Sequence, residues 1–490
     1  MKNSKERNCI RKKHIYCKKL NYFIIVLVMT LGIMSLGSCK KQVPQKPNFV
    51  FIFIDDLGYF DVGYMGAKYY KTPNIDKLAS EGMIFTQAYA NAANCAPTRA
   101  SLLTGQYSPR HGVFTVGKSD RGQSADRRII PVENSKTVPL ENLTIGEALK
   151  DAGYRTAAIG KWNIGNSPEE QGFDISHSNI SLGFRNGHLN EKGEYLADRL
   201  TDEAVEFIKD NAENPFFLYL AHYSVHTPIE AKEELIGKYK TAETDGCHNN
   251  PVYAAMIESV DESVGRVTQT LDELGIADNT VVVFFSDNGG YGPVTCMDPL
   301  RGAKGMYYEG GIREPMAVRW PSRVKAGTVS ETPVIGLDFF PTFLDLAGMS
   351  IPDGKILDGQ SIVPLLLGEK SPGRDKMFWH FPAYLEKYNG GMEDARDPLF
   401  RTRPVSVIRK GDWKLMLYYE EWMLDGGEKT IATNNAVELY NLAEDIGETD
   451  NLANSDTVRR NELLSDLFRW LKDVDAPLPE GENPDYIDTK

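Results

Sequence analysis

Two uninterrupted apolar runs constrain the fold of this chain more than any other feature. Residues 48–54 read NFVFIFI and residues 280–285 read TVVVFF. A strand with one solvated face alternates apolar and polar residues, whereas a continuous apolar run is typical of a central strand covered on both faces. Each run leads into side chains that carry oxygen, namely Asp55 and Asp56, and then Asp287 and Asn288.

Helical patterns alternate with strands between these two runs. The sequence predicts helices at residues 72–79, 143–152 and 251–274, and further strands at residues 154–159 and 215–220. This alternation predicts an α/β fold with one large, mostly parallel sheet sandwiched by helices. The site of such a sheet lies along the carboxyl ends of its strands.

Beyond residue 364 the pattern changes to short strands and turns. Strands are predicted at residues 405–409, 414–419 and 438–442, with a closing helix at residues 458–471. We therefore predict a catalytic domain at residues 47–368 and a smaller C-terminal α+β subdomain, built on an antiparallel sheet, at residues 369–490.

The oxygen-bearing side chains after the two apolar runs predict a cation site. Asp55 and Asp56 are adjacent like charges, which a cation stabilises. Carboxylate and amide oxygens suit a hard cation such as Ca²⁺ or Mg²⁺ and not zinc. The predicted ligands are Asp55, Asp56, Asp287 and Asn288.

A cysteine stands at the predicted start of a short helix in residues 94–105, NCAPTRASLLTG. Pro97 suits an early helical position and Gly105 a helix end. The free N–H groups and the positive end of a helix dipole favour an anion near Cys95, and Arg99 adds a positive charge one turn later. The segment is therefore suited to a tetrahedral anion.

This segment resembles the signature of the formylglycine-dependent sulfatases, which have the alkaline-phosphatase-like fold. The next segment, YSPRHG at residues 107–112, also resembles the family's sequence. Further segments that resemble family motifs lie at residues 160–165, 301–315, 411–415 and 438–445, and the resemblance as a whole spans residues 47–455. It implies that a maturation enzyme oxidises Cys95 to formylglycine (3-oxoalanine), whose hydrate is the nucleophile. It also implies that the cation is Ca²⁺, with Cys95 among its ligands.

The resemblance implies roles for the basic residues as well. Arg99, Lys161 and Lys304 match the family's basic residues around the sulfate. His226, in SVHTP, matches the histidine on the leaving-group side and is the predicted general acid. His222 is the competing assignment for that role.

One position departs from the family pattern. The family sequence GKWHLG reads GKWNIG here, which places Asn163 where a histidine contacts the nucleophile's hydroxyl and helps release sulfate. Asn163 can form a hydrogen bond but carries no proton at neutral pH. We expect another base to serve the second half-reaction, such as a metal-ligand carboxylate or a histidine on the substrate side.

Several further polar residues are candidates for contacts to the substrate. A loop rich in Gly, Asn and Ser carries His177, Arg185 and His188. The predicted substrate-binding residues are His177, Arg185, His222 and His380. These residues, and His111 after the nucleophile helix, are equally compatible with packing.

The N-terminus resembles that of a bacterial lipoprotein. Lys and Arg precede an apolar run at residues 22–36, and LGSC follows at residues 36–39. We predict a signal peptide at residues 1–38, a lipidated Cys39 and a linker at residues 39–46, with a plain anchor or a plain secretory signal as alternatives. The lipid would attach the protein to a membrane of the cell envelope, in the periplasm or at the outer membrane.

Charge and cysteine content restrict the partners. The formal net charge is −13, and removal of residues 1–38, which hold eight Lys/Arg residues and one Glu, leaves −20. Such acidity argues against nucleic acid as a partner. Two cysteines lie in the predicted leader, Cys39 is the predicted lipidation site and Cys95 is the predicted nucleophile position. The remaining two, Cys247 and Cys296, either form a disulfide or stay as free thiols.

We predict a sulfatase that hydrolyses a sulfate ester on a carbohydrate. The carbohydrate follows from the predicted envelope location, where lipoprotein sulfatases commonly degrade sulfated glycans. One alternative is a phosphonate or phosphodiester hydrolase of the same superfamily. The other is a surface glycan-binding protein that has lost catalysis, which Asn163 alone suggests.

Overall fold

Strand β1 (Asn48–Ile54) lies inside the central sheet and is fully buried. The computed structural model describes residues 46–369, 373–388 and 394–488. Phe49, Phe51 and Phe53 pack into a core on one side of the sheet, and the alternate residues of β1 pack into a core on the other side. The continuous apolar run is therefore explained by burial of both faces.

The strand order of the central sheet is β10-β2-β8-β7-β1-β6-β4-β5, with β9 also paired to β2. The pairs β1–β6, β1–β7, β4–β6, β4–β5, β2–β9 and β2–β10 are parallel, whereas β8 is antiparallel to β7 and β2. The predicted mixed, mostly parallel sheet is confirmed. The strand bounds are β2 (Met83–Tyr89), β4 (Arg155–Gly160), β5 (Ile175–His177), β6 (Phe216–Ala221), β7 (Thr280–Ser286), β8 (Arg313–Arg319), β9 (Thr328–Ser330) and β10 (Val334–Ile335).

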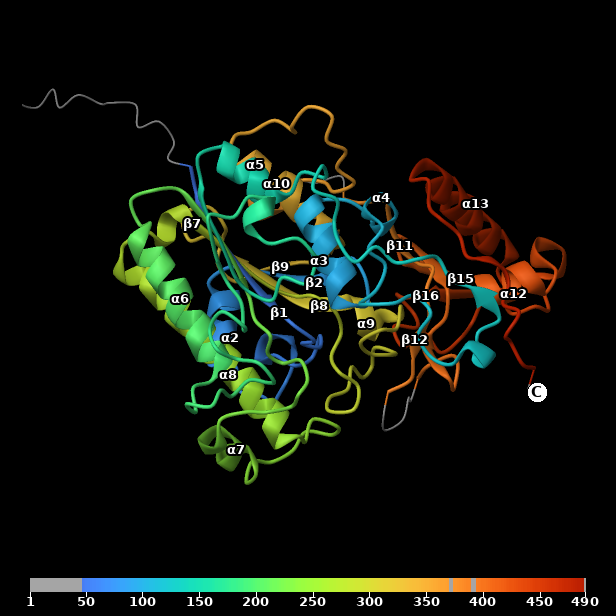
Figure 1. The fold of residues 1–490 in the computed structure, drawn as a ribbon, viewed down its shortest axis with the longest axis horizontal. Coiled ribbons are helices and arrows are strands. Elements are labelled where there is room, and N and C mark those ends of the chain that lie inside the picture. The colour runs from blue at the N-terminus through green and yellow to red at the C-terminus, as the bar shows by residue number, and fades with distance from the viewer. Residues whose placement is uncertain (1–45, 370–372, 389–393, 489–490) are drawn as a thin grey trace, which may run out of the picture. The chain divides into compact units, whose positions relative to one another are not determined.

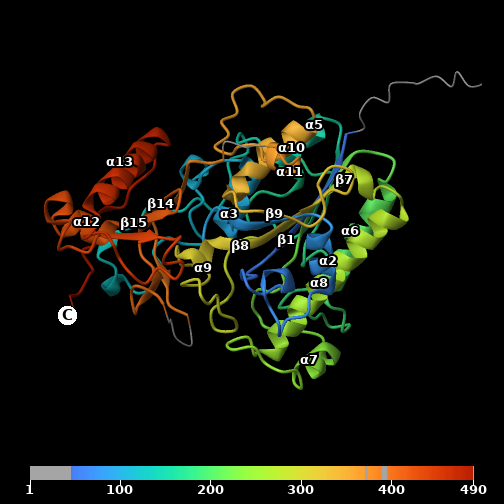
Figure 2. The ribbon, with the colours of Figure 1, turned by 180° about the vertical axis from the view of Figure 1, so that it is seen from behind.

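Helices cover both faces of this sheet (Figures 1 and 2). One group is α2 (Pro73–Ser80), α6 (Leu196–Asp210) and α8 (Pro251–Glu273). The other group is α3 (Cys95–Thr104), α5 (Ile145–Asp151) and α10 (Phe339–Leu346). The apolar stripe of α8, which includes Val260, Val264 and Val267, is fully buried against the sheet. It therefore serves as core, as its helical spacing indicates.

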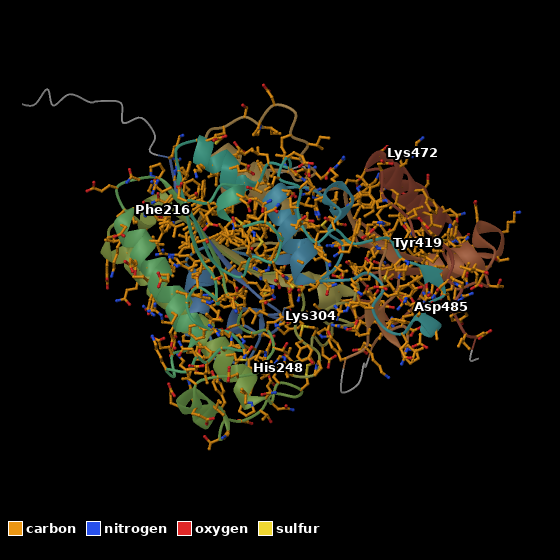
Figure 3. All side chains as sticks on the ribbon, in the orientation of Figure 1. Phe216, His248, Lys304, Tyr419, Lys472 and Asp485 are labelled. Carbon is orange, nitrogen blue, oxygen red and sulfur yellow. A yellow bond between two sulfur atoms is a disulfide. The ribbon has the colours of Figure 1, made fainter. Side chains whose placement is uncertain are left out.

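A second, antiparallel sheet follows in the C-terminal part of the chain. Its order is β11-β14-β15-β16, with β11 (Lys376–Phe381), β14 (Val405–Lys410), β15 (Trp413–Tyr418) and β16 (Val437–Asn441). Helix α13 (Thr457–Asp473), on which Figure 3 labels Lys472, packs on this sheet through the stacked rings of Phe378 and Trp470, whose centroids are 4.6 Å apart. The predicted C-terminal sheet is confirmed.

Short elements connect these layers. Two of them, β12 (Leu385–Glu386) and β13 (Phe400–Thr402), pair with each other and reach the site described below. The others are α4 (Ser108–His111), α7 (Glu233–Tyr239), α9 (Glu309–Ile312), α11 (Val363–Leu366), α12 (Tyr419–Leu424), β3 (Ile129–Ile130) and β17 (Glu480–Glu482).

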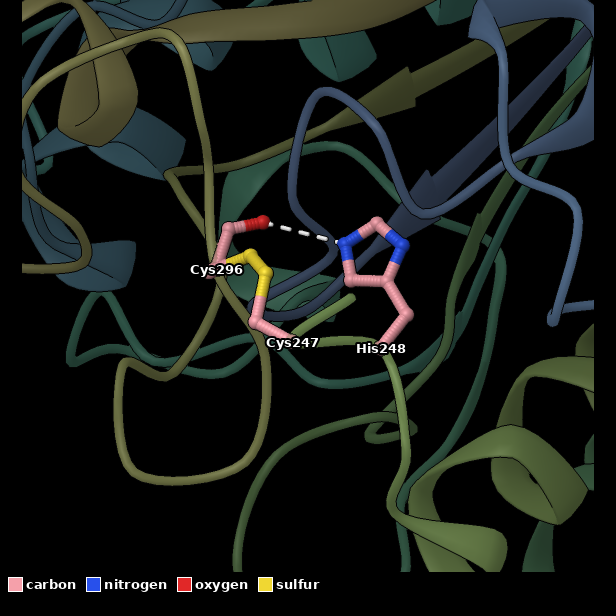
Figure 4. A group of neighbouring side chains, drawn as sticks. All are labelled: Cys247, His248 and Cys296. Atoms are coloured by element: carbon pink, nitrogen blue, oxygen red, sulfur yellow. Dashed lines mark hydrogen bonds between the residues drawn. A yellow bond between two sulfur atoms is a disulfide. The ribbon is translucent and has the colours of Figure 1, made fainter. Parts of the chain in front are cut away.

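Cys247 and Cys296 form a disulfide with a Cα–Cα distance of 6.1 Å, which resolves the two alternatives for these cysteines (Figure 4). Beside them, the His248 ring donates a 3.2 Å hydrogen bond to the carbonyl oxygen of Cys296. The bond joins the segment before α8 to the long loop that follows β7. The predicted signal peptide, Cys39 and most of the linker lie outside the described residues. Within those residues, none of the helices is both long and apolar enough to cross a bilayer.

Candidate active site

The predicted site residues converge at one edge of the central sheet. β1 pairs in parallel with both β6 and β7, so the carboxyl ends of these three strands lie together. Asp55 and Asp56 follow β1, and Asp287 follows β7. Helix α3 brings Cys95 to the same edge, where the Cys95 sulfur and one carboxylate oxygen each of Asp55 and Asp287 lie within 4.8 Å of one another.

These side chains fit a hard cation. Asp55 Oδ1 and Asn288 Oδ1 are buried without a hydrogen-bond partner among the described residues. Burial, followed by the charge of Asp55, raises the pKa of Asp287 to about 7, so the ionised carboxylate is unfavourable in this environment without a further cation. Asn288 Nδ2 donates to Asp56 Oδ1 at 2.9 Å, and this bond fixes the orientation of the amide so that its oxygen, Oδ1, stays free. A cation bound by these oxygens would satisfy the orphaned atoms and relieve the repulsion.

Three cations pair with these carboxylates. Arg99 is fully buried and donates to Asp287 Oδ2 from Nη2 at 2.6 Å and from Nε at 3.0 Å. Lys161 pairs with Asp55, and the ammonium of Lys304 lies 2.6 Å from Asp56 Oδ2. Although burial acts to raise it, Lys161 holds the pKa of Asp55 below its ordinary value. Lys161 and Lys304 also line the pocket described below, whereas Arg99 lies behind the carboxylates.

Cys95 lies at the N-terminus of α3 and is only 2% exposed. Burial raises the pKa of its thiol, so the unmodified side chain would be a weak nucleophile at neutral pH. Asn163 Nδ2 lies 3.3 Å from the Cys95 sulfur, which places Asn163 in contact with the position of the nucleophile. Asn163 has φ of 60°, a left-handed conformation that asparagine tolerates better than most residues.

His226 approaches the same site from the segment after β6. Its Nε2 lies 3.8 Å from Asp56 Oδ2, and its side chain is about one-third exposed to the pocket. The buried His188 ring donates from Nε2 to the backbone oxygen of His226 at 2.8 Å. The carboxylate of Glu230 in turn accepts from the backbone N–H groups of His188 and Leu189, at 2.7 and 3.0 Å. His226 is thus held from behind by a hydrogen-bonded loop.

The cysteine, the lysines, Asn163 and His226 described above line an open pocket of about 450 Å³. Its floor includes Cys95, Asn163 and Lys304, and Figure 3 labels Lys304 in the loop between β7 and α9. A rim of further residues surrounds the opening. We define the rim as Arg121, Tyr291, Glu386, Lys387, Tyr388 and Arg401.

The four predicted substrate-binding residues do not line this pocket. His222 is fully buried with Nε2 2.9 Å from Ser263 Oγ, and His380 is 3% exposed with Nδ1 2.7 Å from Ser406 Oγ. Burial lowers the pKa of both imidazoles to about 4. Both are core residues, which corrects their assignment to the substrate and removes His222 as the alternative general acid. His177 lies 3.5 Å from Glu203, and Arg185 is exposed elsewhere on the surface.

Sequence reasoning missed the rim and the role of His188. The rim residues come from loops and from the β12–β13 hairpin, far apart in the chain, and none belongs to a recognisable motif. His188 appeared as a loop residue with a possible substrate contact, whereas its partner is the backbone of His226. Only the folded chain brings these residues to the site.

The α/β fold, the oxygen-lined cation site and the neighbouring basic side chains define a hydrolase of tetrahedral-anion esters. The family model "Sulfatase" matches residues 47–349, and the model "N-sulphoglucosamine sulphohydrolase, C-terminal" matches residues 303–475. The chain belongs to the sulfatase family, of the alkaline-phosphatase-like superfamily, and is a sulfuric ester hydrolase.

Known relatives cover most of the chain. A "Sulfatase" of Formosa agariphila is 32% identical over 94% of this chain and 95% of the relative. The N-acetylgalactosamine-6-sulfatase of Homo sapiens is 30% identical over 68% of each chain. The crystal structure of Ps i-CgsB in complex with k-i-k-neocarrahexaose aligns with a TM-score of 0.69 and 29% identity, over 87% of this chain and 93% of that one.

Proposed function

We propose that this enzyme hydrolyses a sulfate ester on a carbohydrate, using a formylglycine made from Cys95 and a Ca²⁺ ion. The observation that carries the proposal is the placement of Cys95. Its sulfur lies beside Asp55 and Asp287 at the floor of an open pocket, in a position where the thiol itself is poorly reactive. Oxidation to an aldehyde, followed by addition of water, would give a geminal diol at this position, and a hydroxyl of that diol is an effective nucleophile.

Asp55, Asp56, Asp287 and Asn288 would hold the ion, together with an oxygen at position 95. When bound, the ion supplies Lewis-acid stabilisation of the sulfate oxygens, and the hydrated aldehyde supplies the attacking hydroxyl. Mg²⁺ is the other cation that this donor set accepts.

The chain's own residues would bind the sulfate and move the protons. Lys161 and Lys304 present ammonium groups to the pocket, where they would stabilise the charge that develops on the sulfate oxygens. His226, whose imidazole lines the pocket, would donate a proton to the departing alcohol. Asn163 would donate a hydrogen bond to the group at position 95 without moving a proton.

The names of relatives support a carbohydrate substrate. Several mammalian relatives are N-acetylgalactosamine-6-sulfatases, although two others are steryl-sulfatases, and the structure of Ps i-CgsB contains a neocarrahexaose. The pocket rim is polar and charged, with two tyrosines, which suits a sugar better than a sterol. The sequence LGSC at residues 36–39 further supports our proposal of a lipoprotein of the bacterial envelope, anchored through Cys39.

Sulfate release tests this function. The enzyme, coexpressed with a formylglycine-generating maturation enzyme, would be assayed against sulfated mono- and disaccharides, with a phosphonate monoester for comparison. We expect sulfate release from at least one sugar, loss of activity on chelation, and recovery with Ca²⁺. Cys95→Ala should lose activity. Faster turnover of the phosphonate than of every sulfate ester would contradict the proposal.

A further inference from the structure

At the floor of the pocket, three positively charged side chains pair with three carboxylates, so their charges cancel without any contribution from the rim. Arg99 pairs with Asp287, Lys161 with Asp55, and Lys304 with Asp56. A divalent cation would add the positive charge that a bound sulfate and the nucleophile require. The reacting sulfate therefore needs no further cation from the rim.

The rim nevertheless carries an excess of positive charge. It holds three cations, Arg121, Lys387 and Arg401, and a single carboxylate, Glu386. Arg121 Nη2 lies 2.5 Å from Glu386 Oε1, so this pair is neutral. In the described part of the chain no carboxylate lies within 4.0 Å of the charged groups of Lys387 or Arg401. This excess stands out because the whole chain has a net charge of −13.

Arg401 is held in a fixed position. Its Nε donates to the backbone oxygen of Glu386 at 2.8 Å, and its guanidinium lies 4.2 Å from the centre of the Tyr388 ring. The hydroxyl of Tyr388 donates to the backbone oxygen of Lys304, and the Tyr291 ring packs edge-on against Tyr388 with centroids 5.2 Å apart. These contacts fix the rim relative to Lys304 on the floor. A guanidinium held in this way is a preorganised donor to an anion.

We propose that Lys387 and Arg401 form a second anion-binding site for a substituent on the sugar next to the one that loses its sulfate. This inference rests on the proposed function and names the substrate class more closely, as a glycan with anionic groups on adjacent sugars. The ligand chemistry is that of a sulfate or a carboxylate. The rim thereby selects polyanionic segments over isolated sulfated sugars.

Competition assays on the mature enzyme test this site. Hydrolysis of 4-nitrophenyl sulfate serves as the reporter, with inorganic sulfate as the probe of the floor. Three disaccharides with the same sulfated sugar serve as probes of the rim: one has a neutral neighbour, one a sulfated neighbour and one a uronic acid neighbour. We expect inhibition constants at least fivefold lower for one or both of the probes with an anionic neighbour. Comparison of the disaccharide that has a sulfated neighbour with the one that has a uronic acid neighbour shows whether the site prefers a sulfate or a carboxylate.

Two variants and a control test whether Lys387 and Arg401 cause the preference for an anionic neighbouring sugar. Lys387→Ala and Arg401→Gln should each reduce the preference for an anionic neighbour about threefold or more, while the inhibition constant of inorganic sulfate changes less than twofold. Lys325→Ala, an exposed lysine outside the pocket, is the matched control and should change neither. Thermal unfolding identifies any variant that does not fold; if Arg401→Gln does not fold, the exposed Lys387 carries the test through Lys387→Ala and Lys387→Gln.

Equal affinity of the wild-type enzyme for all three disaccharides would overturn the inference, as would a preference that survives both substitutions. Calorimetric titration with the same disaccharides measures the preference independently of turnover. If 4-nitrophenyl sulfate is not hydrolysed, the calorimetric preference alone decides the role of the rim, whereas failure to release sulfate from every sugar tested would count against the proposed function.

Discussion

At the scale of single residues, the hydrogen-bond partners of the nucleophile decide the kinetics. Asn163 occupies the position from which a proton carrier would serve the group at position 95, and its amide lies 3.3 Å from the Cys95 sulfur. An amide can orient that group, whereas it cannot accept a proton at neutral pH. We therefore expect Asn163 to affect the second half-reaction more than binding of the sulfate.

Asn163→His should relieve a slow step. We expect the wild-type enzyme to show a burst of alcohol release followed by slower turnover, because expulsion of sulfate lacks a base at this position. The histidine should raise steady-state turnover about tenfold, which is less than the roughly 10²–10⁴-fold typical of general acid–base catalysis because another base already serves the step. Its backbone tolerates the φ of 60° better than most residues would. Rapid-quench kinetics measure the burst, and unchanged kinetics in both Asn163→His and Asn163→Ala would contradict this account.

His188 should act as a positioning residue for His226. His188→Leu removes the donor to the half-buried backbone oxygen of His226, at a cost of about 0.5–1.5 kcal/mol for the lost hydrogen bond. We expect turnover of sugar sulfates, whose alcohols need a proton, to fall about tenfold. Aryl sulfates with good leaving groups should be affected much less.

A conservative variant separates this role from a structural one. His188→Gln can place an amide donor at a similar reach and should recover most of the lost activity. His226→Gln should show the same selective loss as His188→Leu. An equal decrease for both substrate types in His188→Leu would show that His188 supports the fold and not the proton donor.

At the scale of elements, the site depends on loops that strands and a disulfide hold in place. The loop after β7 begins with Asp287 and Asn288, and it ends near Lys304. Cys296 lies between these ends and is bonded to Cys247 ahead of α8. Both ends of this loop could be predicted as site residues, because Asp287 and Asn288 follow an apolar run and Lys304 lies in a family motif. The disulfide between Cys247 and Cys296 could not be predicted, because it depends on how α8 packs on the sheet.

Removal of the disulfide should weaken the site as well as the fold. The bond closes a loop with a sequence separation of 49 residues, for which chain entropy predicts a loss of up to about 4 kcal/mol. We expect the Cys247→Ser/Cys296→Ser variant to have a lower unfolding midpoint and a KM raised several-fold, because the segment that carries Lys304 loses its tether. Denaturant unfolding and steady-state kinetics measure the two effects. Unaltered KM with reduced stability would show that the tether serves only the fold.

At the scale of the whole molecule, the buried strands and helices could be predicted from the sequence better than the strand order and the residues around the pocket. Continuous apolar runs identified the buried strands β1 and β7, and helical spacing identified α8 as core. The order of the strands, the antiparallel direction of β8 and the rim contributed by β12 and β13 could not be predicted, because they depend on contacts between distant segments. Histidines were the most frequent error, since a buried histidine and a ligand histidine look alike in a sequence.

Those buried histidines predict sensitivity to acid. Burial lowers the pKa of His111 to about 3 and that of His222 and His380 to about 4, below the ordinary value of 6.5. At these three positions the unfolded chain therefore binds protons below pH 6.5 that the folded chain does not, and their contribution to stability is lost as the pH decreases from about 6.5 toward 4.

Each of these groups should cost about 2 kcal/mol of stability at pH 5 relative to pH 7.5. Buried carboxylates with raised pKa values, such as Asp287, change stability in the opposite direction, so the test compares urea unfolding of the wild-type protein with that of His380→Gln at the two pH values. The stability lost between pH 7.5 and pH 5 should be about 2 kcal/mol smaller in His380→Gln. The same pH dependence in both proteins would contradict the assignment of His380 to the core.

The mass of the tryptic peptide of residues 78–99, from protein purified out of its native host, tests the central claim most directly. We predict a peptide in which the side chain of Cys95 is an aldehyde, with the sulfur replaced by oxygen, and which reacts with a hydrazide probe. An unmodified thiol at this position would contradict the account, because the buried Cys95 would then lack the nucleophile that sulfate ester hydrolysis requires.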